Sequence, residues 1–367
     1  MAAVCLLGRS IARRATAVAV LVLAMLLVAA PAFATTLTFI TTFGSSGSGS
    51  SFLRGPLDAA INDTTGRVYI ADGDNSRVQW FSATGDYEGQ QNGWGTPGGF
   101  LTRPSGVAVN QTTGDVYVAD TNSGYITQFG ENGAYVRKWG GYGTGSGQFG
   151  TPWGIDINQK TGNVYVADNG RKTVQYFSSS GAFIGEFGYN PTPGETFSEL
   201  YSIAINQTTG NVYIVDGGSA DTVQYFSSTG TYLGGWTDHG SDRINGSYGM
   251  AVHPTTGDVY IASTYSNVIT QYSATGTYIG TTGSAGSGAQ NFNTPTGLHI
   301  SGYNSRIYVT DYGNNRIQVL STDQVVAPGA EPTLSLIGVP ASAAWSLALL
   351  ALGGLAIVAL TRRRAHR

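Results

Sequence analysis

The stretch "GNVYVADNG", residues 162–170, is a strand-like run of apolar residues that ends in an aspartate, Asp168. Closely related phrases recur five times in the chain, and their last residues are Asp72, Asp120, Asp216, Ser263 and Asp311. Neighbouring copies are 47 or 48 residues apart. Fixed periods of this size are typical of propellers, solenoids and repeat arrays, so the repeat is the unit that decides the fold.

Each copy contains four short runs rich in β-branched and aromatic residues, separated by turns of Gly, Asn, Thr and Ser, as expected for strands. Six such units predict an all-β, six-bladed β-propeller of four-stranded antiparallel blades over residues 35–321. The last unit has only three runs. We therefore expect the N-terminal run, residues 37–43, to pair beside residues 315–321 and close the ring, which removes exposed sheet edges.

The units resemble the NHL repeat, with the pattern G-[VI]-A-V, then G-x-V-Y-V-A-D-x-x-N-x-R-[IV]-Q-x-F, over roughly residues 36–321. The arginine of the third strand is present in "NSRVQWF" (75–81) and "NNRIQVL" (314–320) but is missing from that place in the other four copies. The resemblance implies a propeller. It also implies possible activities, because some NHL-type propellers are metal-dependent lyases, related six-bladed folds are calcium hydrolases, and some animal members bind RNA.

The N-terminus predicts export. Residues 1–34 contain arginines, an apolar run and then Ala32-Phe33-Ala34, the small-x-small pattern that precedes a signal-peptidase cut. The alternative is an uncleaved membrane anchor. Cys5 is the only cysteine and leaves with the signal peptide, so the mature chain has no thiol for a disulfide or a metal.

The C-terminus predicts attachment to a membrane or surface. Residues 322–340 are interpreted as a linker, residues 341–361 as a transmembrane or sorting helix, and residues 362–367 as a basic cytoplasmic tail. The segment resembles the PEP-CTERM signals handled by exosortases, although Val339-Pro340-Ala341-Ser342 stands in place of Pro-Glu-Pro. We expect an exported protein on the outer face of the cell membrane or the cell surface, and a plain anchor and a cleaved sorting signal both remain open.

Charge argues against nucleic acid as a partner. The formal net charge is −3, but seven of the 19 basic residues lie in the two terminal segments, which leaves 12 basic against 22 acidic residues. Sequence-independent binding to phosphate backbones needs basic patches.

The recurring acidic position has two interpretations. One is a structural cap, in which each side chain accepts N–H bonds of its own turn, and this is the role expected of Asp72, Asp120, Asp168, Asp216, Ser263 and Asp311. The other is a ring of carboxylates around a cation. Asp72 and Asp74 also suggest a calcium loop by their oxygen ligands, although the later bidentate acid of an EF-hand is missing.

Two residues stand out on the innermost strand. The position is alanine in four units but Asp156 in the third and His299 in the sixth. Either side chain is a candidate for the central channel. The purely structural interpretation is a packing variant whose polar group is hydrogen-bonded. They support the alternative function, a metal-dependent lyase or hydrolase, with calcium or zinc as its ion. Zinc sites of this kind need several histidines, and the body has only His239, His253 and His299.

The loops that do not repeat are the preferred candidates for function. The links between blades open on the same face as the loop after the aspartate, and loops on a rigid scaffold commonly carry binding sites. Trp94, Tyr142, Trp153 and Tyr189 are the expected ligand-binding residues of this long-loop face, whereas Phe43, Trp139, Phe187 and Trp236 are expected to pack between blades. The sequence thus predicts a non-catalytic scaffold without a cofactor that binds an extracellular protein, peptide or glycan.

Overall fold

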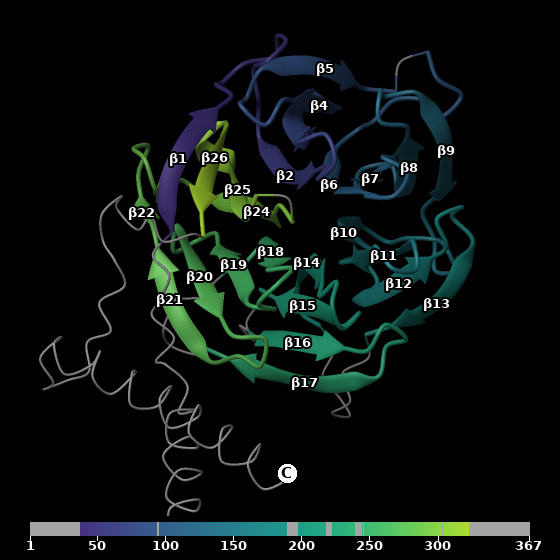
Figure 1. Cartoon of the computed structure of the whole chain (residues 1–367). Helices are drawn as coiled ribbons and strands as arrows, with labels where there is room; N and C mark the ends of the chain where they lie inside the picture. Colours follow the sequence, from purple (N-terminus) through teal and green to yellow (C-terminus); the bar gives the residue numbers. More distant parts are fainter. Residues whose placement is uncertain are drawn as a thin grey trace, which may run out of the picture. The chain divides into compact units, whose positions relative to one another are not determined.

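Six four-stranded antiparallel sheets surround a central channel in the computed structural model (Figure 1), which confirms the predicted six-bladed propeller. The structure describes residues 37–93, 95–188, 197–217, 222–238, 244, 246–302 and 304–322. Within these residues no helix is long and apolar enough to cross a membrane. The signal peptide, the basic tail, the C-terminal helix and all but residue 322 of the linker lie outside the described residues, so they stay predictions.

The strands of each blade run in order from the channel to the perimeter. Blade one contains β2 (Pro56–Ile61), β3 (Val68–Asp72), β4 (Arg77–Phe81) and β5 (Tyr87–Gln91). Blade two contains β6 (Pro104–Val109), β7 (Val116–Asp120), β8 (Tyr125–Phe129) and β9 (Tyr135–Gly140). Blade three contains β10 (Pro152–Asn158), β11 (Asn163–Asp168), β12 (Thr173–Phe177) and β13 (Phe183–Phe187).

The second half of the ring repeats this order. Blade four contains β14 (Leu200–Ile205), β15 (Val212–Asp216), β16 (Thr222–Phe226) and β17 (Tyr232–Thr237). Blade five contains β18 (Gly249–Val252), β19 (Val259–Ser263), β20 (Val268–Tyr272) and β21 (Tyr278–Thr282). The link to blade six holds the short parallel pair β22 (Ser284–Ala285) and β23 (Asn291–Phe292). Two 3₁₀ helices follow second strands, η1 (Gly73–Asn75) and η2 (Tyr312–Asn314).

Blade six closes the ring with both ends of the propeller. Its strands are β24 (Pro295–Ile300), β25 (Arg306–Asp311), β26 (Arg316–Ser321) and β1 (Thr38–Phe43). β1 pairs antiparallel with β26, from Thr38 opposite Ser321 to Phe43 opposite Ile317 (Figure 1). The predicted closure by residues 37–43 is therefore confirmed.

Aromatic side chains of the fourth strands pack between blades, as expected. Trp139 lies 5.9 Å from Phe177 of the next blade, measured between ring centroids. Phe43, Phe187 and Trp236 make the matching contacts at three other joints. A turn glycine of the next blade, such as Gly181, lies directly against each ring. Gly181 has φ +81°, and a Cβ there would come within 2.7 Å of Trp139, so the joint admits only glycine.

The recurring aspartates act across a longer distance than the sequence suggested. Their carboxylates accept N–H bonds from the link that enters their own blade, 17 or 18 residues earlier, as Arg54 N to Asp72 at 2.7 Å illustrates. The same bond is made in four more blades, to Asp120, Asp168, Asp216 and Asp311. Within their own turns, Asp168 accepts main-chain N–H bonds, whereas Asp72 and Asp311 accept side-chain N–H bonds from Asn75 and Asn314.

The third-strand arginines serve these same links. Arg77 donates to the carbonyl oxygens of Ser48, Gly49 and Phe52 and pairs with Asp72 at 2.8 Å. Arg316 repeats the arrangement in blade six. In blade three, Arg171 reaches the equivalent loop from two residues earlier in the chain. The arginine therefore accompanies one type of entering loop and is not required in every blade.

A chain of side chains joins the blades at the opposite face. Gln111 of blade two accepts a bond from Asp63 N and donates one to Ile61 O, both in blade one. Gln159 and Gln207 repeat this contact with the preceding blade. Asp63 itself accepts bonds from Ser301 Oγ and Gly302 N of blade six. Side-chain bonds thus link blades six, one, two, three and four in series, in addition to packing.

We expect Asp168→Ala to lower the free energy of unfolding of the full chain by about 2–4 kcal/mol, because four main-chain N–H groups, from Gly150, Thr151, Gly170 and Arg171, lose a fully buried acceptor. Urea denaturation measures this change. The control is Asp86→Ala, which removes only exposed side-chain contacts and should cost less than about 1 kcal/mol. Equal losses for the two variants would contradict the role given to Asp168.

Candidate functional site

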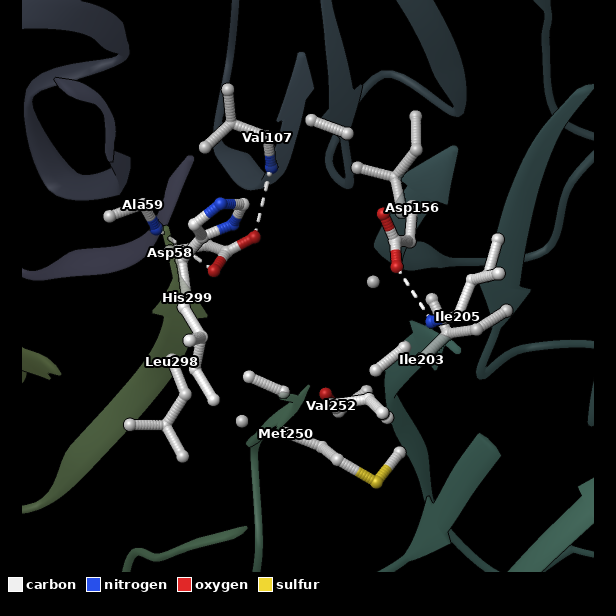
Figure 2. Close-up of a pocket in the computed structure, with 18 of the residues that line it drawn as sticks. Asp58, Ala59, Val107, Asp156, Ile203, Ile205, Met250, Val252, Leu298 and His299 are labelled. Carbon is white, nitrogen blue, oxygen red and sulfur yellow. Dashed lines mark hydrogen bonds between the residues drawn. The ribbon is translucent and has the colours of Figure 1, made fainter. Parts of the chain in front are cut away.

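The central channel forms a cavity of about 120 Å³ that is lined by the innermost strands of all six blades. These strands start at the long-loop face and end at the short-turn face, so residue position along the strand sets depth in the channel. Figure 2 shows the side chains that project into it, most of them apolar. The cavity is large enough for several water molecules or for the end of an extended side chain.

Three aromatic rings gather at the long-loop mouth of this channel. Trp153, Tyr201 and Tyr248 occupy the same repeat position, the second residue of β10 and of β14 and the residue just before β18. The ring of Tyr201 stacks on Tyr248 at 4.3 Å and meets Trp153 edge-on at 5.0 Å. The other three blades carry the smaller Leu57, Ser105 and Thr296 there. We call the three rings the aromatic half-ring.

Polar groups border the half-ring. The guanidinium of Arg103 lies 5.8 Å from the ring centroid of Trp153 and 4.0 Å from a carboxylate oxygen of Asp74. Burial and the neighbouring Tyr201 raise the pKa of Tyr248, so its hydroxyl is neutral and remains a hydrogen-bond donor. An amphipathic aromatic surface beside a cation is the composition that sugar and peptide ligands contact.

Two carboxylates lie deeper in the channel. Asp58 of β2 accepts bonds from Ala59 N (2.9 Å) and Val107 N (3.1 Å). Asp156 of β10 accepts bonds from its neighbour Ile157 N and from Ile205 N of blade four, each at 2.7 Å. Figure 2 shows them projecting from different sides of the channel. Both tie their own blade to the next one.

Burial dominates the protonation of these two acids. It raises the pKa of Asp58 to about 8, with a smaller contribution from the charge of Asp156, although the main-chain bonds act in the opposite direction. Burial likewise raises the pKa of Asp156 to about 7. Near neutral pH both groups therefore titrate, because removing a carboxylate from water disfavours its charge more than the N–H bonds favour it.

His299 of β24 is the third polar group of the wall. Burial lowers the pKa of its imidazole, and the charge of Asp63 opposes this shift. In the sheet register His299 lies opposite Tyr308, and Asp156 lies opposite Tyr165. Both therefore hold the position that alanine fills in the other blades. They line one channel from the opposite blades six and three, so both candidates for the channel do face it.

The described residues contain no group of three or more His, Cys, Asp or Glu side chains placed to hold a metal ion. Asp72 is fully buried and pairs with Arg77, and Asp74 faces Arg103. His253 bonds the N–H groups of Thr255 and Thr256 in a short turn. In the part of the chain that is described, these residues do not form the ligand set that the metal-enzyme alternative needs.

The structure separates the expected ligand-binding residues. Trp153 joins the half-ring, whereas Tyr142 is 60% exposed and donates to Thr121 O at 3.3 Å on the adjacent loop. Trp94 and Tyr189 lie outside the described residues.

Sequence reasoning missed Asp58 and did not associate Tyr201 with Trp153. A signal existed for both: Asp58 stands where other units have glycine or serine, and the three aromatics share one column of the repeat.

Comparison with known families agrees with this architecture. The NHL-repeat model matches residues 53–81, and a model described as a 6-bladed β-propeller matches residues 96–192. This chain carries an NHL repeat within a six-bladed propeller. Among curated proteins, no sequence matches it.

Solved structures share the fold at low sequence identity. A streptogramin B lyase is 12% identical with a TM-score of 0.55, over 78% of this chain and 99% of the lyase. Virginiamycin B lyase from Staphylococcus aureus is 11% identical with a TM-score of 0.53, over 77% and 98%. Hydrazine synthase of Kuenenia stuttgartiensis is 12% identical with a TM-score of 0.52, over 75% and 97%. At these identities the likeness concerns the fold alone.

We expect the channel acids to make stability fall as pH rises from about 4 to about 8. In that window the unfolded chain has lost the two protons, while folded Asp58 and Asp156 keep them because their pKa values are raised. The difference in melting temperature, variant minus original protein, should therefore increase by about 2–5 °C between pH 5 and pH 8.5 for Asp58→Asn and for Asp156→Asn. A difference that does not change with pH would contradict the assigned titration.

Proposed function

We propose that this protein is an exported, non-catalytic binding propeller, held at the cell surface or membrane, whose extracellular ligand binds at the aromatic half-ring. The ligand is a protein, peptide or glycan that contacts the long-loop face. The terminal segments of the sequence support export and membrane attachment. The geometry of the half-ring supports the binding role.

The observation that carries this proposal is the asymmetry of one repeat position. Packing of the ring requires nothing aromatic there, because Leu57, Ser105 and Thr296 fill the same position in three blades. Three consecutive blades nevertheless place Trp153, Tyr201 and Tyr248 there, in contact with one another at the open end of a cavity. Clustered Trp and Tyr side chains with one polar end are the residues that most often dominate binding energy.

The surroundings of the half-ring support binding. Ser105 Oγ and Thr121 Oγ1 are hydrogen-bonded to the main chain around Trp153, at Trp153 O and Pro152 O. These bonds fix the entry of β10, so Trp153 is presented from a rigid strand. A rigid aromatic surface loses little conformational entropy on binding.

We expect Trp153→Ala and Tyr201→Ala each to weaken ligand binding about tenfold or more, since truncated aromatic anchors remove both buried area and stacking. A glycan array and a peptide library, probed with the full chain, supply the ligands, and dissociation constants of each hit are then measured for both variants. Tyr142→Ala tests whether the site extends along the adjacent loop.

The matched control is Tyr278→Ala, because Tyr278 is 43% exposed but lies on the perimeter strand β21. It should leave the affinity for every ligand unchanged. Binding that persists in Trp153→Ala and Tyr201→Ala, with melting temperatures close to that of the original protein, would overturn the proposed site.

A further inference from the structure

Below the half-ring, the channel wall combines an apolar surface with two acids, Asp58 and Asp156. Ile203, Ile205, Met250, Val252 and Leu298 face the cavity between the acidic groups (Figure 2). No lysine or arginine among the described residues forms an ion pair with Asp58 or Asp156. An acid in an apolar cavity without a cation is costly when charged.

The two carboxylates are held in fixed orientations. Each of the four oxygens accepts one main-chain N–H bond, and a carboxylate oxygen has a second lone pair. The bonds come from strands of the ring itself, so the carboxylates do not rotate away from the channel. Their spare acceptor sites are therefore preorganised for a donor that enters along the axis.

We propose that the channel binds an alkylammonium group, with its nitrogen at the carboxylates of Asp58 and Asp156 and its carbon chain against the apolar wall. The group belongs either to a lysine side chain or to a small aliphatic amine. This inference rests on the proposed function, since the half-ring forms the entrance to the channel.

Several features select this chemistry. An ammonium group has three donors and no acceptor, which suits a wall that offers acceptors, and its alkyl stem gains from contact with isoleucine and methionine. The faces of Trp153, Tyr201 and Tyr248 attract cations at the mouth, as the position of Arg103 over Trp153 illustrates. A divalent metal ion is a poorer match, because calcium takes six to eight oxygen ligands.

The depths of the groups fit an extended chain. Asp58 lies one residue below the aromatic position of the repeat, and Asp156 lies two residues deeper than Asp58. Two residues of a strand span about 6.6 Å. An ammonium group that passes the half-ring therefore meets Asp58 first and Asp156 next.

The other charged groups define the pH dependence. His299 shares the wall and is neutral near pH 7, because burial lowers its pKa. Asp63 lies at the far end, bonded to Ser301 and Gly302. Arg103 stays at the mouth beside Asp74. Since Asp58 and Asp156 must ionise to bind a cation, affinity should increase as pH rises from 6 to 8.5, a range in which an amine with a pKa near 10.4 keeps its charge.

The test uses calorimetry on the full chain with matched pairs of probes. Nα-acetyl-lysine amide is compared with Nα-acetyl-norleucine amide, and n-pentylamine is compared with 1-pentanol. At pH 8.5 we expect each amine to bind at least about tenfold more tightly than its neutral partner. Each amine should also bind at least about tenfold more tightly at pH 8.5 than at pH 6. Tighter binding of Nα-acetyl-lysine amide assigns the natural group to a lysine of a peptide. Tighter binding of n-pentylamine assigns it to a small molecule.

Two variants and one further measurement locate the site. Asp58→Asn and Asp156→Asn should each weaken amine binding about tenfold or more, with melting temperatures that show the fold is kept. In the original protein, binding at pH 7 should also release protons, seen as a heat that depends on the ionisation enthalpy of the buffer. Equal binding of amine and neutral probe, no proton release, or a Ca²⁺ complex at these acids without amine binding would overturn the proposal.

The two proposals fail separately. If amines do not bind but Trp153→Ala abolishes binding of an array ligand, the half-ring stands and only the ligand chemistry is wrong. If amines bind through Asp58 and Asp156 while the half-ring variants affect no ligand, the channel is the site and the function proposed for the rim is wrong.

Discussion

Burial of a carboxylate against the N–H groups of an entering loop is the interaction on which the rest of this propeller depends. Each link between blades must travel from the perimeter back to the channel with little regular pairing, of which β22–β23 is an example, and its N–H groups need acceptors there. Asp72 and its four counterparts supply them at the end of the second strand. The innermost strand therefore begins at the same place in each of these blades, and side chains near its start face the channel mouth in a constant register.

The candidate site consists of departures from this regularity. A column of the repeat that is Leu, Ser or Thr in three blades becomes Trp or Tyr in the other three, and a glycine position becomes Asp58 in one blade. The scaffold is constrained at its joints by aromatic packing, by the glutamine bonds and by the closing strand, so such substitutions change the lining of the channel and leave the arrangement of the strands intact. The residues of the candidate site and those that hold the blades together thus occupy different positions of the same repeat.

The sequence predicted the blades, their four strands and the closure by residues 37–43, because a fixed period leaves few other folds. It also placed Asp156 and His299 at one register position. It did not predict that Asp168 and its counterparts reach residues 17 or 18 positions earlier, since local spacing indicates only local turns. It missed Asp58, whose importance depends on cavity walls from other blades. It also grouped Trp153 with loop aromatics rather than with Tyr201, because the sequence of one repeat does not show contacts between blades.

The pairing of Thr38 with Ser321 has a topological consequence. Both ends of the propeller leave from the same blade, side by side, so the ring has no unique first blade. A chain that joined residue 321 to residue 38 and opened at any other link would contain the same contacts in a different order. The single seam also means that the ring closes only once the last strand, β26, has met the first, β1.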